Sequence, residues 1–215
     1  MRINIGCGMS PTQNWVNFDN SFSLKLAKYP LFLSQILAHF KLVDNSQFEY
    51  IKFAVKSDIK YANAAVNIPL DTATVDVLYS SHMLEHLDRL EADKFLQEAF
   101  RVLVPGGTIR LAVPDLEKTV KTYNEKKDAN EFVDSLLMSI SKPRGIREKI
   151  KLMLVGSRHH HWMYDQYSLC KLLEDHGFSD AMALVPGETR IATPEHLDLR
   201  ERAEESLYVE AIKPI

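Results

Sequence analysis

The sequence predicts an α/β fold of Rossmann-like type, with a mostly parallel sheet of seven strands whose two faces are covered. Three observations predict it. Seven short apolar runs of strand length occur along the 215 residues. The first five alternate with helices or helix-sized gaps, which favours parallel strands joined by right-handed crossovers. The first run ends at Gly6 and Gly8 and the second ends at Asp19, a pattern typical of nucleoside-binding α/β units.

The composition is that of an ordinary globular protein, with 46% hydrophobic and 26% charged residues, and we expect one domain over residues 1–215. The net charge is -3 and no run of lysine and arginine stands out, so no nucleic-acid partner is expected. The two cysteines fit no metal or disulfide spacing, which indicates a reducing compartment. A strand from residue 2 leaves no room for a signal peptide, and the apolar stretch 29–40 is too short to span a bilayer. We expect a soluble cytoplasmic protein with no membrane partner.

The first third of the chain predicts two strands and a helical insertion. The strands cover residues 2–6 and 15–19. The loop between them, 9–14, is too short for a crossover helix, because a parallel crossover takes about a dozen residues. Apolar residues recur at helical spacing in 21–56, which predicts a helical insertion there. The insertion either packs against the sheet or shapes an acceptor pocket.

The middle of the chain predicts two further strands and the most regular helix. Residues 57–62 and 75–80 read as strands, separated by a proline turn at 67–71. One apolar stripe and one charged face predict a helix over 91–104, ended by Pro105-Gly106-Gly107. A fifth strand follows at 109–113.

The last third predicts a helical cover and two more strands. The excursion 117–158 is too long for a bare connection, and we expect it to cover the open edge of the site. A helix face ends at Gly177. Strands follow at 178–185 and 207–212, joined by a polar connector over 186–206.

The predicted binding residues lie at the carboxyl ends of the strands, where open parallel sheets bind ligands. Glycine lets a ligand approach the main chain, and an acid after the next strand can accept hydrogen bonds from both hydroxyls of a ribose. The residues that fall at this edge are Gly6, Cys7, Gly8, Asp19, Asn63, Ser81 and His82.

Four motifs in order resemble class I S-adenosylmethionine-dependent methyltransferases of the type 11 branch, which includes many small bacterial enzymes. They are Ile5-Gly6-Cys7-Gly8 with Asp19, Asn67-Ile68-Pro69-Leu70, Ser81-His82-Met83-Leu84-Glu85-His86-Leu87, and Arg101-Val102-Leu103-Val104-Pro105-Gly106-Gly107. The resemblance spans nearly the whole chain and is weakest over 21–56 and 120–158. It implies a seven-stranded sheet with an antiparallel last strand, and S-adenosylmethionine as cofactor.

The resemblance also implies roles by position. The Gly6-Cys7-Gly8 turn would pass under the methionine part of the cofactor, Asp19 would bind the ribose hydroxyls, and Asn63 would meet the adenine amino group. Ser81 and His82 would line the cofactor. The sequence departs from the family pattern in three ways: no third glycine follows Gly8, the first crossover is short, and Asn63 (or Ala64, one register away) stands where an acid is common.

His86 is the candidate general base, because a hydroxyl acceptor would profit from a histidine. It could equally cap or pack locally. His82 and His86 have a metal-ligand spacing, but no third ligand can be named, so no metal is predicted. Glu85 is expected to be structural and to bind a nearby backbone donor. Cys7 is expected to be a small apolar filler.

A run of histidine and aromatic residues precedes the last helix. His161, Trp162 and Tyr164 offer stacking surfaces and donors for a sugar-like or aromatic acceptor. The alternative is a polar loop in which Trp162 is a buried anchor.

The leading hypothesis is methyl transfer to a small molecule, such as a sugar or a cell-surface polysaccharide precursor, since families of this type often accompany polysaccharide synthesis. The chain lacks the Asn-Pro-Pro-Tyr run typical of amino-group methylation on adenine or glutamine. A nucleotide-dependent oxidoreductase would need a third glycine and a longer first crossover. A degenerate methyltransferase fold that serves as a non-catalytic binding subunit is the remaining alternative.

Overall fold

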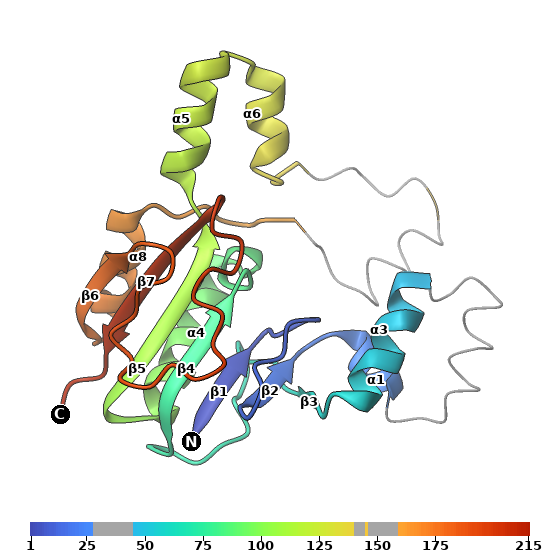
Figure 1. The fold of residues 1–215 in the computed structure, drawn as a ribbon, viewed down its shortest axis with the longest axis vertical. Helices are drawn as coiled ribbons and strands as arrows, with labels where there is room; N and C mark the ends of the chain where they lie inside the picture. The colour runs from blue at the N-terminus through green and yellow to red at the C-terminus, as the bar shows by residue number, and fades with distance from the viewer. Residues whose placement is uncertain (28–44, 140–144, 146–158) are drawn as a thin grey trace.

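The computed structural model describes residues 1–27, 45–139, 145 and 159–215. Its centre is a seven-stranded sheet in the order β3-β2-β1-β4-β5-β7-β6 (Figure 1). The strands are β1 (Arg2–Ile5), β2 (Val16–Asp19), β3 (Lys60–Tyr61), β4 (Val75–Ser81), β5 (Leu103–Pro114), β6 (Ser179–Leu184) and β7 (Ser206–Ile212). The helices are α1 (Phe22–Ala27), α3 (Asn45–Lys56), the 3-10 helix η1 (Leu84–His86), α4 (Arg89–Val102), α5 (Leu116–Lys126), α6 (Ala129–Ser135) and α8 (Gln166–Asp175). None of the helices in the described ranges is both long and apolar enough to cross a bilayer.

The strand directions confirm the predicted sheet. Strands β1 to β5 are parallel to one another, and β7 is antiparallel to both β5 and β6. Ile5 lies opposite both Phe18 and Ser80 in the register. The residues that follow these positions, from the glycine turn to Asp19, therefore meet at one edge of the sheet.

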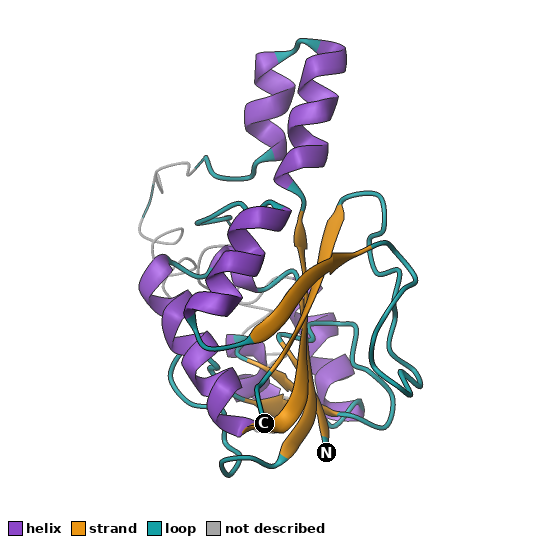
Figure 2. Ribbon diagram, turned by 90° about the vertical axis from the view of Figure 1, so that its left-hand side faces the viewer, coloured by secondary structure: helices purple, strands orange, loops and turns teal. Residues whose placement is uncertain are grey.

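Helices α4 and α8 cover one face of the sheet (Figure 2). Helix α4 begins at a capping box formed by Asp88 and Glu91, and its buried stripe consists of Ala92, Phe95, Leu96, Ala99 and Val102. The helix ends two residues before the predicted end, because Leu103 already pairs with Val75 as the first residue of β5. The predicted glycine stop thus lies inside the strand, at an irregularity of the β4–β5 pairing.

The opposite face is covered by a loop instead of a crossover helix (Figure 2). Ile191 and Leu197 of the connector pack with Trp15, Tyr79 and Tyr208 in a separate apolar cluster. The short first crossover predicted from the sequence is present, since only residues 6–15 join β1 to β2. The connector between β6 and β7 therefore covers apolar surface that a first crossover helix would otherwise shield.

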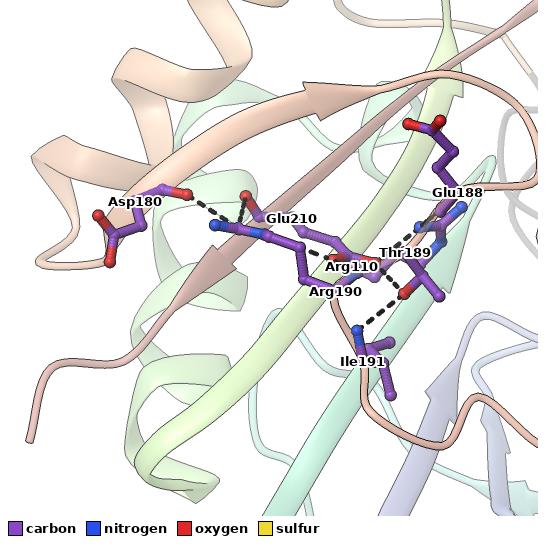
Figure 3. Close-up of polar contacts among 7 residues, drawn as sticks. All are labelled: Arg110, Asp180, Glu188, Thr189, Arg190, Ile191 and Glu210. Atoms are coloured by element: carbon purple, nitrogen blue, oxygen red, sulfur yellow. Dashed lines mark hydrogen bonds and ion pairs between the residues drawn. The ribbon is translucent and has the colours of Figure 1, made fainter.

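A buried ion pair ties this connector to the sheet (Figure 3). Arg110 of β5 and Glu210 of β7 are fully buried and lie 2.7 Å apart. Glu210 also accepts hydrogen bonds from the Thr189 hydroxyl and the Arg190 backbone N–H, at 2.6 and 2.8 Å. Arg110 donates to the backbone carbonyl of Glu188 at 2.9 Å. Glu210 therefore has an opposite charge and further hydrogen-bond donors, which offset its desolvation, whereas Nε and Nη2 of Arg110 are buried without a hydrogen bond from the described residues.

The two predicted helical segments are described in part. Helices α1 and α3 lie beside the β3 edge of the sheet (Figure 1), and the stretch 28–44 of the insertion is outside the described residues. Of the predicted cover, α5 and α6 form a hairpin that projects beyond the carboxyl end of β5, and neither helix has a buried residue. The positions 140–144 and 146–158 of the cover are likewise outside the described ranges.

The third strand is shorter than predicted. Residues 57–59 were expected to be part of it, but α3 extends to Lys56 and Asp58 has a φ of 48°. A positive φ for a residue other than glycine marks a turn. Only Lys60 and Tyr61 pair with β2.

Candidate functional site

The glycine turn after β1 is bonded directly to the end of β2. The backbone N–H groups of Gly6 and Cys7 both donate to the carbonyl oxygen of Phe18, at 2.8 and 3.1 Å. The N–H of Gly8 donates to Oδ2 of Asp19 at 3.0 Å. The structure thus brings together the two parts of the predicted nucleoside site.

Asp19 keeps acceptor capacity beyond these bonds. Its Oδ1 accepts the backbone N–H of Ser21 at 2.7 Å, so each carboxylate oxygen holds one backbone donor. A carboxylate has about four lone-pair sites, which leaves acceptors for the two hydroxyls of a ribose. The side chain is half-buried, so a ligand can reach it.

The two glycines are required for different reasons. Gly6 has a φ of +72°, and a Cβ there would lie 2.7 Å from Cγ of Met83. Gly8 has a φ of +50°, but a Cβ there would meet no atom within 4 Å. Gly6 therefore permits close packing against the segment after β4, whereas the backbone at Gly8 borders open space. An open backbone beside a carboxylate fits the approach of a cofactor.

The helical insertion packs against this turn. Cys7 is buried in a cluster with Leu24 of α1 and Ala54 of α3. Burial, and then the charge of Asp19, raise the pKa of its thiol to about 12, so Cys7 is an apolar filler, as predicted. Burial and the charge of Asp19 also raise the pKa of Tyr50, which places this α3 side chain near the carboxylate. The sequence analysis did not identify Tyr50, because this residue is far from Asp19 in the sequence and only the folded chain brings the two together.

Asn63 and Ser81 lie at the same edge of the sheet. Asn63 comes two residues after Tyr61, which pairs with Asp19, and its Oδ1 accepts the backbone N–H of Ala65 at 3.2 Å. Ser81 ends β4, and its buried hydroxyl has no hydrogen-bond partner among the described residues. A buried hydroxyl without a partner is unusual, and a bound ligand would satisfy it.

The ring of His82 is engaged with the protein. Its backbone has a left-handed φ of 47°, and its N–H donates to the carbonyl of Ala112 at 2.8 Å. Its Nε2 lies 2.8 Å from Oγ of Ser206, at the start of β7. This side chain therefore links β4 to β7, and its predicted contact with a cofactor stays a prediction.

The segment after β4 is joined to residues 159–162. The backbone carbonyl of Glu85 accepts the N–H groups of His161 and Trp162, at 2.7 and 3.2 Å. Nδ1 of His86 lies 3.1 Å from the carbonyl oxygen of His159. Glu85 was expected to be structural and to bind a backbone donor. The second part is wrong for the described residues: neither carboxylate oxygen accepts a hydrogen bond from any of them, whereas the backbone carbonyl accepts two.

The three predicted acceptor residues differ in exposure. His161 is exposed, and Trp162 is 43% exposed with the Arg89 guanidinium 5.0 Å from its ring centroid. The alternative of Trp162 as a buried anchor is therefore wrong. Tyr164 is fully buried in the main core, and burial raises its pKa to about 12. Tyr164 is the anchor of this segment, since its backbone also pairs with Asp115.

An open pocket of about 640 Å³ runs along β2 and β3, under α1 and α3. Its lining extends from Met1, Val16 and Pro69 near the amino ends of the strands to Phe18, Leu24, Ala54 and Tyr61. Neither the glycine turn nor Asp19 lines it, whereas parallel sheets bind ligands at the carboxyl ends, where these residues lie. The glycine turn and Asp19 therefore remain the candidate site.

Comparisons with known proteins show the family of this chain. A family model described as a methyltransferase domain matches residues 4–111, half of the chain and all of the predicted cofactor contacts. A Mycolicibacterium smegmatis protein named as a probable S-adenosylmethionine-dependent methyltransferase is 40% identical over 58 residues. That match covers 27% of this chain and spans only 21% of the relative.

Solved structures show the same fold. The crystal structure of an S-adenosylmethionine-dependent methyltransferase from Methanosarcina mazei aligns with a TM-score of 0.52 at 16% identity, over 99% of this chain and 92% of that one. One from Archaeoglobus fulgidus gives a TM-score of 0.52 at 13% identity, over 98% and 85%. The chain therefore belongs to the methyltransferase domain family, the type 11 branch of the class I S-adenosylmethionine-dependent methyltransferases.

Proposed function

We propose that the protein transfers the methyl group of S-adenosylmethionine to a small molecule with a sugar-like or aromatic group. The observation that carries this proposal is the bond between Gly8 and Asp19 beside open space. Asp19 would hold the ribose hydroxyls, and the turn at Gly6 to Gly8 would lie along the methionine part. Ser81 would donate its buried hydroxyl, and Asn63 would meet the adenine.

The arrangement of the predicted binding residues supports binding of S-adenosylmethionine. Asp19 has free acceptor sites, Gly8 has room beside it, and Ser81 has a buried hydroxyl to satisfy. When bound, S-adenosylmethionine supplies a methyl group on an already activated sulfonium. The protein then mainly binds and orients the acceptor. This positioning supplies a large part of the reduction in activation free energy.

The acceptor class rests on Trp162 and its neighbours. Trp162 is half-exposed, and Arg89 and His161 beside it are exposed. An indole surface beside hydrogen-bond donors suits a sugar ring, and the guanidinium would favour an acceptor that also carries a phosphate. A sugar phosphate or nucleotide sugar is therefore the first acceptor to test.

The test is transfer of a labelled methyl group to a panel of nucleotide sugars and aromatic metabolites. We expect label in a sugar-containing product, and a higher KM for this acceptor in Trp162→Ala with little change in cofactor affinity. Leu90→Ala is the matched control, because Leu90 is a comparably exposed apolar residue next to Arg89. A chain that binds S-adenosylhomocysteine but labels neither sugar-containing nor aromatic molecules would contradict the proposed acceptor class, and label in aromatic molecules alone would exclude the sugar phosphate. A chain that binds neither cofactor form would favour the non-catalytic alternative.

A further inference from the structure

Three potential metal-ligating side chains converge next to the candidate site. Glu85 and His86 follow β4, and His160 precedes α8. One carboxylate oxygen and one ring nitrogen from each histidine all lie within 4.8 Å of one another. The backbone bonds from residues 161 and 162 to the carbonyl of Glu85 hold the two segments in this position.

The carboxylate of Glu85 lacks the partners that a buried charge requires. The side chain is 1% exposed, and neither oxygen accepts a hydrogen bond from any described residue. The nitrogens nearest to Oε1 are Nδ1 of His82 at 3.4 Å and Nε2 of His86 at 3.9 Å. These separations exceed the usual hydrogen-bond range, and a buried carboxylate without hydrogen bonds or a cation is costly. A cation bound beside this carboxylate would offset that cost.

Both histidines of the cluster have a nitrogen available. Nδ1 of His86 faces the carbonyl oxygen of His159 at 3.1 Å, and a carbonyl only accepts, so this nitrogen carries the proton. In the neutral ring, Nε2 then has a free lone pair on the side of Glu85. A histidine that donates its other N–H to a backbone carbonyl is the usual arrangement of a metal ligand.

His160 is the second nitrogen ligand. The residue is 8% exposed, and its Nδ1 is buried without a hydrogen-bond partner in the described part of the chain. The ring centroids of His86 and His160 are 5.1 Å apart, in an edge-to-face arrangement.

We propose that Glu85, His86 and His160 bind one divalent transition-metal ion, with Zn²⁺ as the first candidate. Two imidazoles and one carboxylate are an established zinc donor set, which leaves a fourth position for water or a ligand. Magnesium and calcium prefer oxygen ligands alone. Ligand atoms about 2.1 Å from a tetrahedral ion lie about 3.4 Å apart, so small side-chain rotations would close the cluster.

The ion would join two segments that are far apart in the sequence. It would fix residues 82–86 against residues 159–162, next to the predicted acceptor contacts His161 and Trp162. A metal-bound Nε2 cannot also accept a proton, so this proposal assigns His86 the role of a ligand instead of a general base. The sequence alone offered only His82 and His86, and the fold supplies His160 in place of His82.

The test is metal binding by the full chain without an affinity tag. After removal of metal with a chelator, the protein is titrated with Co²⁺ and then with competing Zn²⁺. We expect about one equivalent, visible absorption bands typical of nitrogen and oxygen ligands, and a rise in Tm with Zn²⁺. Glu85→Gln and His160→Ala should bind at least about 100-fold more weakly.

The control is His161→Ala, which removes an exposed imidazole from the same histidine run and should retain the metal. Equal loss in His161→Ala and His160→Ala would show adventitious binding by that run and overturn the proposal. A wild-type chain without a Co²⁺ spectrum or Tm shift would also overturn it, and would indicate that Glu85 and His82 share a proton. If the buried variants do not fold by circular dichroism, His86→Gln at the half-exposed position gives the same comparison. Methyl transfer is not measured, so failure here leaves the proposed function untouched.

Discussion

The backbone N–H of Gly8 donates to Oδ2 of Asp19 at 3.0 Å, so the turn after β1 and the acid after β2 form one unit. The acid thereby shapes the turn as well as offering acceptors to a ligand. The missing third glycine leaves this bond intact. Its place is taken by Met9-Ser10-Pro11, where the Ser10 N–H closes the turn on the carbonyl of Cys7 at 2.8 Å.

The two glycines of this turn should respond differently to alanine. Gly6→Ala places a Cβ 2.7 Å from Met83 at a positive φ, so we expect about 2–4 kcal/mol of lost stability from strain and overpacking together. Gly8→Ala meets no atom, so only the strain of about 1–2 kcal/mol remains. Urea unfolding measures both.

Gly8→Ala should also change the affinity for the cofactor. The Cβ of Gly8→Ala enters the open space beside Asp19, so this variant should stay folded and bind S-adenosylhomocysteine more weakly. Calorimetry on the folded variant checks this. Wild-type affinity in Gly8→Ala would mean that the cofactor does not approach that backbone.

The buried pair Arg110–Glu210 should show strong coupling. Glu210→Leu leaves Arg110 fully buried without its partner, and we expect a loss of about 3–5 kcal/mol. The double variant Arg110→Met with Glu210→Leu removes both charges and should lose less than the sum of the single variants. Chemical unfolding of the wild type, the two single variants and the double variant gives the coupling energy. Strictly additive losses of stability would contradict the predicted coupling.

Stability at low pH should depend on Glu98. Its hydrogen bonds from the Arg101 side chain, and then the N–H of Ile68, lower its pKa below the usual value. A lowered carboxylate pKa contributes stability above the unfolded value of about 4.3, and this contribution is lost as the pH falls through the folded pKa. Glu98→Gln should therefore be less stable than the wild type at about pH 6. The difference in the free energy of unfolding between the two proteins should narrow towards about pH 3. A difference that is constant over this range would rule out the ionised pair as its source.

The sequence predicted the parts of the fold that depend on local patterns. Apolar runs located all seven strands, and the glycine turn with Asp19 indicated a candidate site, because these features need only neighbours along the chain. Boundaries were missed where tertiary pairing decides them, as at Leu103, which enters β5 through its contact with Val75.

The contacts made across the fold could not be predicted. Nothing local in the polar connector indicated that Ile191 and Leu197 would cover the sheet, or that Arg110 would meet Glu210. The same holds for His160, which reaches Glu85 only because two distant segments share backbone bonds. Tyr164 was predicted to contact the acceptor but is fully buried in the core, since aromatic residues in one short run do not reveal which of them faces the core.

The most direct test of the account is calorimetric binding of S-adenosylhomocysteine to the wild type, Asp19→Ala and Asp71→Ala. Asp71 is an exposed acid at the other end of the sheet and serves as the control. We predict that the wild type and Asp71→Ala bind alike, and that Asp19→Ala binds more weakly by about 1–3 kcal/mol, the scale of lost hydrogen bonds to a charged group. Unchanged affinity in Asp19→Ala, or a wild-type preference for a nicotinamide dinucleotide, would contradict the central claim.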